Sequence, residues 1–183
     1  TESRAGMTTG DLDEIARREC QRLGGTCSFK GYRGFPAHLC VSVNDQIVHG
    51  IPGSRILKEG DLVSCDFGVI LRGFQGDAAL SFGIGQISAK TAALLEITEA
   101  SLALGIQACQ PGNHLGDIGA AIETYAEQRG YGVVREYTGH GIGREMHEEP
   151  QVPNFGEPGT GIEIRPGMVL ALEPMINPGD WRT

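Results

Sequence analysis

A short pattern of glycines and aspartates occurs twice in this chain, and it constrains the fold more than any other feature. Gly6, Gly10-Asp11-Leu12 and Gly24 recur 106 residues later as Gly112, Gly116-Asp117-Ile118 and Gly130. Each copy is followed by a glycine-rich passage with the letters His-Gly-Ile, at 49–51 and 140–142. Helices often begin with Gly-Asp and end with glycine, so coincidence is the alternative. A duplication predicts two half-domains that share one core and face each other across a cleft.

The composition indicates one globular domain. The 183 residues are 40% hydrophobic and 21% charged, and no apolar run approaches the roughly 18–20 residues that span a bilayer. A net charge of −8 argues against binding to nucleic-acid phosphates, which requires clustered Lys and Arg. The five cysteines are scattered and form no C-x-x-C pair, which excludes a thiolate zinc site of that kind and favours the reducing cytoplasm.

Hydrophobic periodicity predicts three helices and six strand-like stretches. The helices are expected at 8–23, 88–107 and 114–129. The strands are expected at 39–43, 46–48, 61–70, 73–82, 132–137 and 168–173. Because this order is not a strict β-α-β alternation, the α+β class is favoured over a doubly wound sheet.

Asp66 and Asp77 lie on two strand-like stretches joined by a predicted tight turn. If that turn centres on Leu71-Arg72, the two carboxylates lie directly opposite each other on one face. Opposed carboxylates with apolar neighbours are costly unless a proton or a cation lies between them. The alternative is that Asp77 is a surface acid and Asp66 pairs with an arginine.

Glu173 is the second unusual acid. Five apolar residues precede it and Pro-Met-Ile follows, which predicts a buried strand. A buried carboxylate needs a partner because its desolvation costs several kcal/mol, about the usual effective penalty for an ion. A glutamate in a salt bridge within the core is the alternative.

Three histidines lie in glycine-rich turns. His140 stands between two glycines, which we expect to let a loop aim its imidazole into a cleft, and His147 follows seven residues later. The spacing is not that of H-E-x-x-H on a helix. A lone histidine is usually structural, but His49, His140 and His147 together with the three acids point to one site.

Two aspartates, one histidine and one glutamate make an oxygen-rich ligand set. Such a set suits Mn, Fe, Co or Zn, and a shared carboxylate suits two ions. Two ions about 3.5–4 Å apart can share a water and lower its pKa. The reaction class that this chemistry predicts is metal-assisted hydrolysis.

The succession of motifs along the chain resembles the type I methionine aminopeptidases, which have the pita-bread fold. The motifs are GYRGFP (31–36), CVSVND (40–45), IVHGIP (47–52), LKEGDLVSCDFGVI (57–70), GFQGD (73–77), VVREYTGHGIG (133–143), MHEEPQVPN (146–154) and RPGMVLALEPMI (165–176). The resemblance implies an α+β catalytic domain over 1–183. Its two pseudo-symmetric halves, about 1–87 and 88–183, would surround a curved antiparallel sheet with helices on the outer face.

The resemblance also implies roles for individual residues. Asp77, His140 and Glu173 would hold one divalent ion, Asp66 and Asp77 a second, and Glu173 would accept a proton from the attacking water. His147 would polarise the scissile carbonyl, and His49 would lie near the amide nitrogen. The methionine pocket would be lined by Phe29, Tyr32, Phe35, Cys40 and Met146.

The implied reaction is the removal of the initiator methionine from nascent proteins, with small second residues favoured. The expected partner is the N-terminal peptide of a nascent chain, with ribosome association left open, and we expect a cytoplasmic monomer. One rival is an Xaa-Pro peptidase, which would bring a large extra N-terminal domain. Another is an inactive binding relative, which would have lost ligands that are all present here.

The chain also departs from the family pattern. The family has an N-terminal helix, a fifth ligand (a second bridging glutamate on a later strand) and a closing strand, whereas these residues end at GDWRT. Trp181 does not match the family's tryptophan beside the pocket. We therefore expect a piece truncated at both ends, and leave open whether it is active alone.

The first prediction concerns the stoichiometry of metal binding. The second ion would keep only Asp66 and Asp77 as ligands, so we expect this chain to bind two ions poorly. Isothermal titration with Mn²⁺ or Co²⁺ measures this directly. Two tight sites on the 183-residue chain would contradict the expectation.

Overall fold

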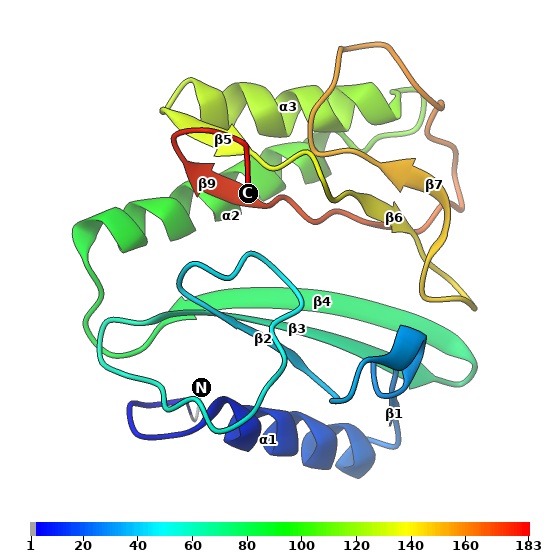
Figure 1. Ribbon diagram of the computed structural model, residues 1–183. Helices are drawn as coiled ribbons and strands as arrows, with labels where there is room; N and C mark the ends of the chain where they lie inside the picture. Colours follow the sequence, from blue (N-terminus) through cyan, green and yellow to red (C-terminus); the bar gives the residue numbers. More distant parts are fainter. Residues whose placement is uncertain (1–2) are drawn as a thin grey trace. The chain divides into compact units, whose positions relative to one another are not determined.

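The structure is a computed structural model, and it describes residues 3–183 (Figure 1). The chain divides into two compact units. The first comprises the residues up to Ala92 together with Gly143–Met146, and the second comprises Ala93–Ile142 and the residues from His147 onward. Each unit combines helices with antiparallel strands, which confirms the predicted α+β class.

The first unit is built around its longest hairpin. Its elements are α1 (Thr9–Arg22), β1 (Thr26–Cys27), the 3₁₀ turn η1 (Tyr32–Gly34), β2 (Cys40–Val43), β3 (Leu62–Leu71) and β4 (Phe74–Gly83). Strand β3 pairs antiparallel with β1, β2 and β4, so it is the strand that organises this sheet. Helix α1 buries Leu12 in a core with Val41, Val43 and Val63 of β2 and β3.

The second unit contains a helix pair and short strands. Its elements are α2 (Ala89–Ala108, which begins in the first unit), α3 (Leu115–Glu127), β5 (Tyr131–Val133), β6 (Gly139–Gly141), β7 (Glu148–Val152), β8 (Leu170–Ala171) and β9 (Ile176–Pro178). Strand β5 pairs with β9, and β6 lies between β7 and β8. The core forms around Ile118, Ile122 and Ala126 of α3. Over residues 3–183, every helix is too short or too polar to span a membrane.

The three predicted helices are present within two residues of their expected ends. The strand expected at 46–48 is wrong: Asn44 adopts a left-handed φ of 60°, and the Gln46 side chain accepts a hydrogen bond from the Val43 N–H. The stretches at 132–137 and 168–173 form strands of only three and two residues. Strands β1, β6, β7 and β9 were missed because each is at most five residues long.

The two copies of Gly-Asp perform the same task at the starts of α1 and α3. The carboxylate of Asp11 accepts the Thr8 N–H at 2.7 Å, and that of Asp117 accepts the His114 N–H at 2.6 Å. The N–H of Gly159 also donates to Asp117, and these backbone bonds hold the pKa of Asp117 below its ordinary value. Both helix starts are therefore capped by an acid in the first turn.

The glycine before each capping aspartate lies against a neighbouring loop. The N–H of Gly10 donates to Gly53 O, and the N–H of Gly116 donates to Thr160 O, both at 2.9 Å. A β-carbon at Gly116 would overlap the carbonyl oxygen of Glu157. The second glycine of the repeated pattern is therefore required by a close backbone approach rather than by helix propensity.

The core of the second unit yields a stability prediction. Ile122 is fully buried and packs against Gly105 of α2. We expect Ile122→Ala to lower the free energy of unfolding by about 2–5 kcal/mol, through lost burial and the cavity it leaves. The control is Ile106→Ala, because that side chain is 55% exposed and should change stability by about 0.5 kcal/mol or less. Urea denaturation of the two variants measures the difference, and equal losses would contradict this account of the core.

Candidate metal centre

Asp66 and Asp77 lie on the same face of the β3–β4 hairpin, but they are not directly opposed. The register pairs Asp66 with Ala79 and Gly68 with Asp77. The turn is formed by Arg72 and Gly73, both with positive φ, rather than by the predicted Leu71-Arg72. The prediction of direct opposition is therefore wrong by two residues. Because side chains alternate with period two, that shift keeps both carboxylates on one face, as diagonal neighbours.

These carboxylates make the face electronegative. Cys40 of β2 pairs with Asp66 across the sheet. Burial, and after it the negative charges of Asp66 and Asp77, together raise the pKa of the Cys40 thiol to about 12. Because the two carboxylates disfavour a further negative charge on Cys40, the same face favours a bound cation.

His140 lies on a strand, which corrects the expected loop. It is the middle residue of β6, opposite Gln151 of β7 and Ala171 of β8. A β-carbon at Gly139 would overlap the Ala171 carbonyl oxygen, and one at Gly141 would overlap that of Glu149. The two glycines are therefore needed because strands approach closely on both sides of β6, and not to form a turn.

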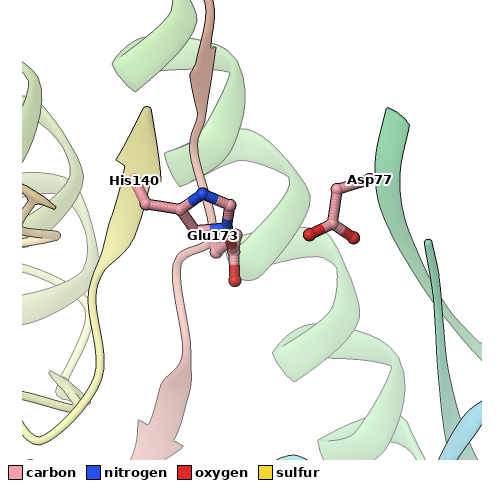
Figure 2. Close-up of side chains that lie close together, drawn as sticks. All are labelled: Asp77, His140 and Glu173. Carbon is pink, nitrogen blue, oxygen red and sulfur yellow. Dashed lines mark ion pairs between the residues drawn. The ribbon is translucent and has the colours of Figure 1, made fainter. Parts of the chain in front are cut away.

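The imidazole of His140 presents one nitrogen to Glu173. Its Nδ1 lies 2.8 Å from the carbonyl oxygen of Gly141, which only an Nδ1–H can satisfy as a hydrogen bond. In the neutral ring, Nε2 then carries a lone pair and accepts hydrogen bonds. This nitrogen lies 3.0 Å from Glu173 Oε1 (Figure 2). Two acceptors that face each other at this distance repel unless a proton or a cation lies between them.

Glu173 lies between β8 and β9 rather than within a buried strand, so that prediction is wrong in its detail. Its side chain is 38% exposed, yet its Oε1 atom is buried. That oxygen lies within ion-pair distance of His140, and it has no hydrogen-bond partner among the residues that the structure describes. The main chain of Glu173 is fixed by Asn154, whose buried amide donates to its carbonyl oxygen at 2.8 Å.

The other two histidines belong to different units. His147 stands beside His140 in the second unit, with ring centroids 4.2 Å apart and planes tilted by 43°. His49 is exposed in the first unit and has a φ of 59°, a left-handed conformation that is uncommon for a residue with a β-carbon. Such backbone strain is concentrated at functional sites.

The residues expected to line the methionine pocket gather in the first unit. The rings of Phe29 and Phe35 meet edge to face at 6.4 Å, and the N–H of Tyr32 donates to the Phe29 carbonyl. Met146 belongs to this unit and is 2% exposed. Cys40 lies on strand β2, which pairs with β3 of the same unit.

Two contacts that involve predicted site residues or their neighbours were not predicted, one in each unit. The Ser28 hydroxyl lies 2.7 Å from Gln75 Oε1, which links the segment before Phe29 to β4. Asn154, described above, was missed as well. Gln75 drew notice in the sequence because it directly precedes Gly-Asp. Its partner Ser28, and the partner of Asn154, lie far away in the sequence, so no local pattern indicated either contact.

The donor types fit a divalent cation. In the first unit, Asp77 of β4 presents a carboxylate on the electronegative face, and Figure 2 labels it on its strand. In the second unit, His140 Nε2 lies 3.0 Å from Glu173 Oε1, a buried oxygen that has no hydrogen-bond partner within residues 3–183. Carboxylate and imidazole together suit first-row divalent ions. A separate groove of about 570 Å³ in the second unit, which runs past Pro150 and Phe155, contains none of these groups.

Comparison with known proteins places the chain among metallopeptidases. The profile of metallopeptidase family M24 matches residues 1–183. The methionine aminopeptidase of Clostridium perfringens is 53% identical over 179 residues, which cover 98% of this chain and 72% of that protein. The crystal structure of methionine aminopeptidase from Rickettsia prowazekii matches with a TM-score of 0.96 and 40% identity, over 97% of this chain and 72% of that one.

A second kind of enzyme shares the fold. The prolidase from Pyrococcus furiosus matches with a TM-score of 0.77 at 20% identity, over 94% of this chain and 49% of that one. At this identity the likeness concerns the fold alone. Together the matches confirm the pita-bread fold implied by the sequence motifs.

The facing lone pairs yield a prediction for Glu173→Gln. The new amide can donate to His140 Nε2, so we expect the melting temperature of the metal-free protein to rise by about 2–4 °C, as expected for about 1 kcal/mol in a chain of this size. The rise that Mn²⁺ produces in the parent should be lost. The control is Glu163→Gln, an exposed acid. A lower melting temperature in metal-free Glu173→Gln would instead indicate a protonated His140 paired with Glu173. Thermal unfolding with and without Mn²⁺ measures both effects.

Proposed function

We propose that this chain, which belongs to metallopeptidase family M24 and is a metal-dependent hydrolase, removes the initiator methionine from nascent proteins. The observation that carries the proposal is the 53% identity to a methionine aminopeptidase over 98% of the chain. The predicted ligands Asp66, Asp77, His140 and Glu173 are all present. An inactive relative would be expected to have lost some of them.

The metal ligands are proposed as two sets that share one residue. Asp77, His140 and Glu173 would hold one divalent ion. Asp66 and Asp77 would hold a second ion more weakly, so that Asp77 would be a ligand of both. Mn, Fe, Co and Zn all suit these donors. Bound ions of this kind lower the pKa of a water and polarise a carbonyl group. The negative face around Cys40 and the buried Glu173 Oε1, which lies beside His140 Nε2, support this assignment.

The remaining steps belong to side chains of the protein. Glu173 accepts the proton that the attacking water releases, and its buried Oε1 has no competing hydrogen-bond partner in the described part of the chain. His147, beside His140, donates to the oxygen of the scissile carbonyl as negative charge develops there. His49 contacts the amide nitrogen, a role in keeping with its exposed and strained position.

The substrate is recognised by its apolar first side chain. Phe29, Phe35 and Met146 offer aromatic and thioether surface suited to methionine, with Tyr32 and Cys40 completing the wall. The partner is the N-terminal peptide of a nascent chain, and ribosome association belongs to the same proposal. We place this activity in a cytoplasmic monomer.

Hydrolysis of Met-Ala-Ser tests the function. We expect the chain loaded with Mn²⁺ or Co²⁺ to release methionine, and a chelator to abolish the release. Glu173→Gln should lower kcat by about 10²-fold or more, the usual contribution of a general base. Glu163→Gln, at an exposed acid, is the matched control and should leave kcat unchanged.

Two outcomes would contradict the proposal. Cleavage that persists in excess chelator would rule out the metal-dependent mechanism. Cleavage of Ala-Pro but not of Met-Ala-Ser would assign the chain to the Xaa-Pro peptidases, which share its fold.

A further inference from the structure

Gly68 occupies a central position on the face that carries the acids. It lies on β3 two residues after Asp66, directly opposite Asp77 of β4, and it is buried. Its carbonyl oxygen accepts the N–H of Ser28 at 2.9 Å, which fixes the chain just before Phe29 against β3. Gly68 therefore adjoins both the carboxylates and the apolar residues of the first unit.

The space that a side chain would take at position 68 is filled by its neighbours. A β-carbon there would lie 2.5 Å from Met146 Cε, 2.7 Å from Phe29 Cε1 and 2.9 Å from Ser28 Cβ. All three distances are shorter than β-carbon contacts in real proteins, so something would have to shift at each contact. The methyl group of Met146 and the edge of the Phe29 ring thus pack directly on the bare backbone of β3.

The three neighbours differ in their freedom to move. Ser28 is held by its N–H bond to Gly68 and by its hydroxyl contact with Gln75. The Phe29 ring is 9% exposed and lies edge to face with Phe35. Met146 is unbranched and flexible. A side chain at position 68 would therefore displace Met146 most easily and Phe29 next, away from β3.

We infer that Gly68 is a specificity-determining residue: its missing side chain lets Met146 and Phe29 sit back against β3 and leaves room for a long, unbranched first side chain of the substrate. This inference rests on the proposed function, because it takes Met146 and Phe29 as the pocket wall. A β-carbon at position 68 makes the pocket shallower, so shorter side chains such as norvaline gain over methionine.

The chain offers a matched control glycine on the partner strand. Gly76 precedes Asp77 in β4 and pairs with Val69, so it lies on the other face of the sheet. A β-carbon at Gly76 would meet only Val69 Cγ1 at 3.3 Å and Val69 O at 3.9 Å. Gly76→Ala therefore adds the same methyl group beside the same aspartate without touching Met146 or Phe29.

The kinetic test compares Met-Ala-Ser with norvaline-Ala-Ser. In Gly68→Ala we expect the kcat/KM ratio of methionine to norvaline to fall about tenfold, the lower end of what one methylene is worth in an apolar pocket, mainly through KM. The ratio should be unchanged in Gly76→Ala, and Met146→Ala should restore it in the Gly68→Ala background. Equal losses for both substrates, or an unchanged ratio, would overturn the inference.

A second measurement does not depend on activity. With ¹³C-methyl-labelled methionine, the Met146 resonance, assigned through Met146→Ala, should shift when L-methionine is added to the Mn²⁺-free parent chain. The same addition should produce a smaller shift in Gly68→Ala. A Met146 resonance that ignores L-methionine in the parent would overturn the inference. Failure of the parent to cleave Met-Ala-Ser, with the NMR shift present, would overturn the proposed function and leave the role of Gly68 supported.

Discussion

The close approach of His140 Nε2 to Glu173 Oε1 is the interaction on which the candidate centre depends. Both atoms accept hydrogen bonds when the imidazole donates its Nδ1–H to the Gly141 carbonyl, and they lie 3.0 Å apart. Several neighbouring features maintain this unfavourable arrangement. Strand β6 is held between β7 and β8, and the Asn154 amide fixes the main chain of Glu173. The surrounding structure thus holds two lone pairs together, which is the condition that a cation relieves.

For the hairpin that carries the two aspartates, the sequence predicts the strands and the shared face but not the register. The apolar alternation around Asp66 predicts a strand, and period-two geometry places Asp66 and Asp77 on one face. The exact register could not be predicted without the turn. Arg72 adopts a φ of 53° although it is not a glycine, and this moves the turn by one residue and the pairing by two.

The predictions that placed His140 in a loop and Glu173 in a buried strand were wrong for a different reason. Glycines on both sides of His140 are as compatible with a loop as with a crowded strand, and the groups that crowd it come from Glu149 and Ala171. Such contacts are tertiary, so no local pattern reveals them. The same holds for Gly68, whose neighbour Met146 lies far along the chain. The metal ligands could be proposed from their residue types, whereas the pocket wall was inferred only from the resemblance to a family.

The twin helix caps lead to a different view of the repeated pattern. At the starts of α1 and α3 the same backbone groups are bonded in the same way, yet His-Gly-Ile has a different conformation in each copy. His49 lies exposed in a left-handed turn, and His140 lies buried in a strand. The geometry shared by the two caps therefore does not extend to the histidines that follow them. Two helix starts that are capped alike are thus followed by two unlike histidines, one exposed on a strained backbone and one buried in a strand.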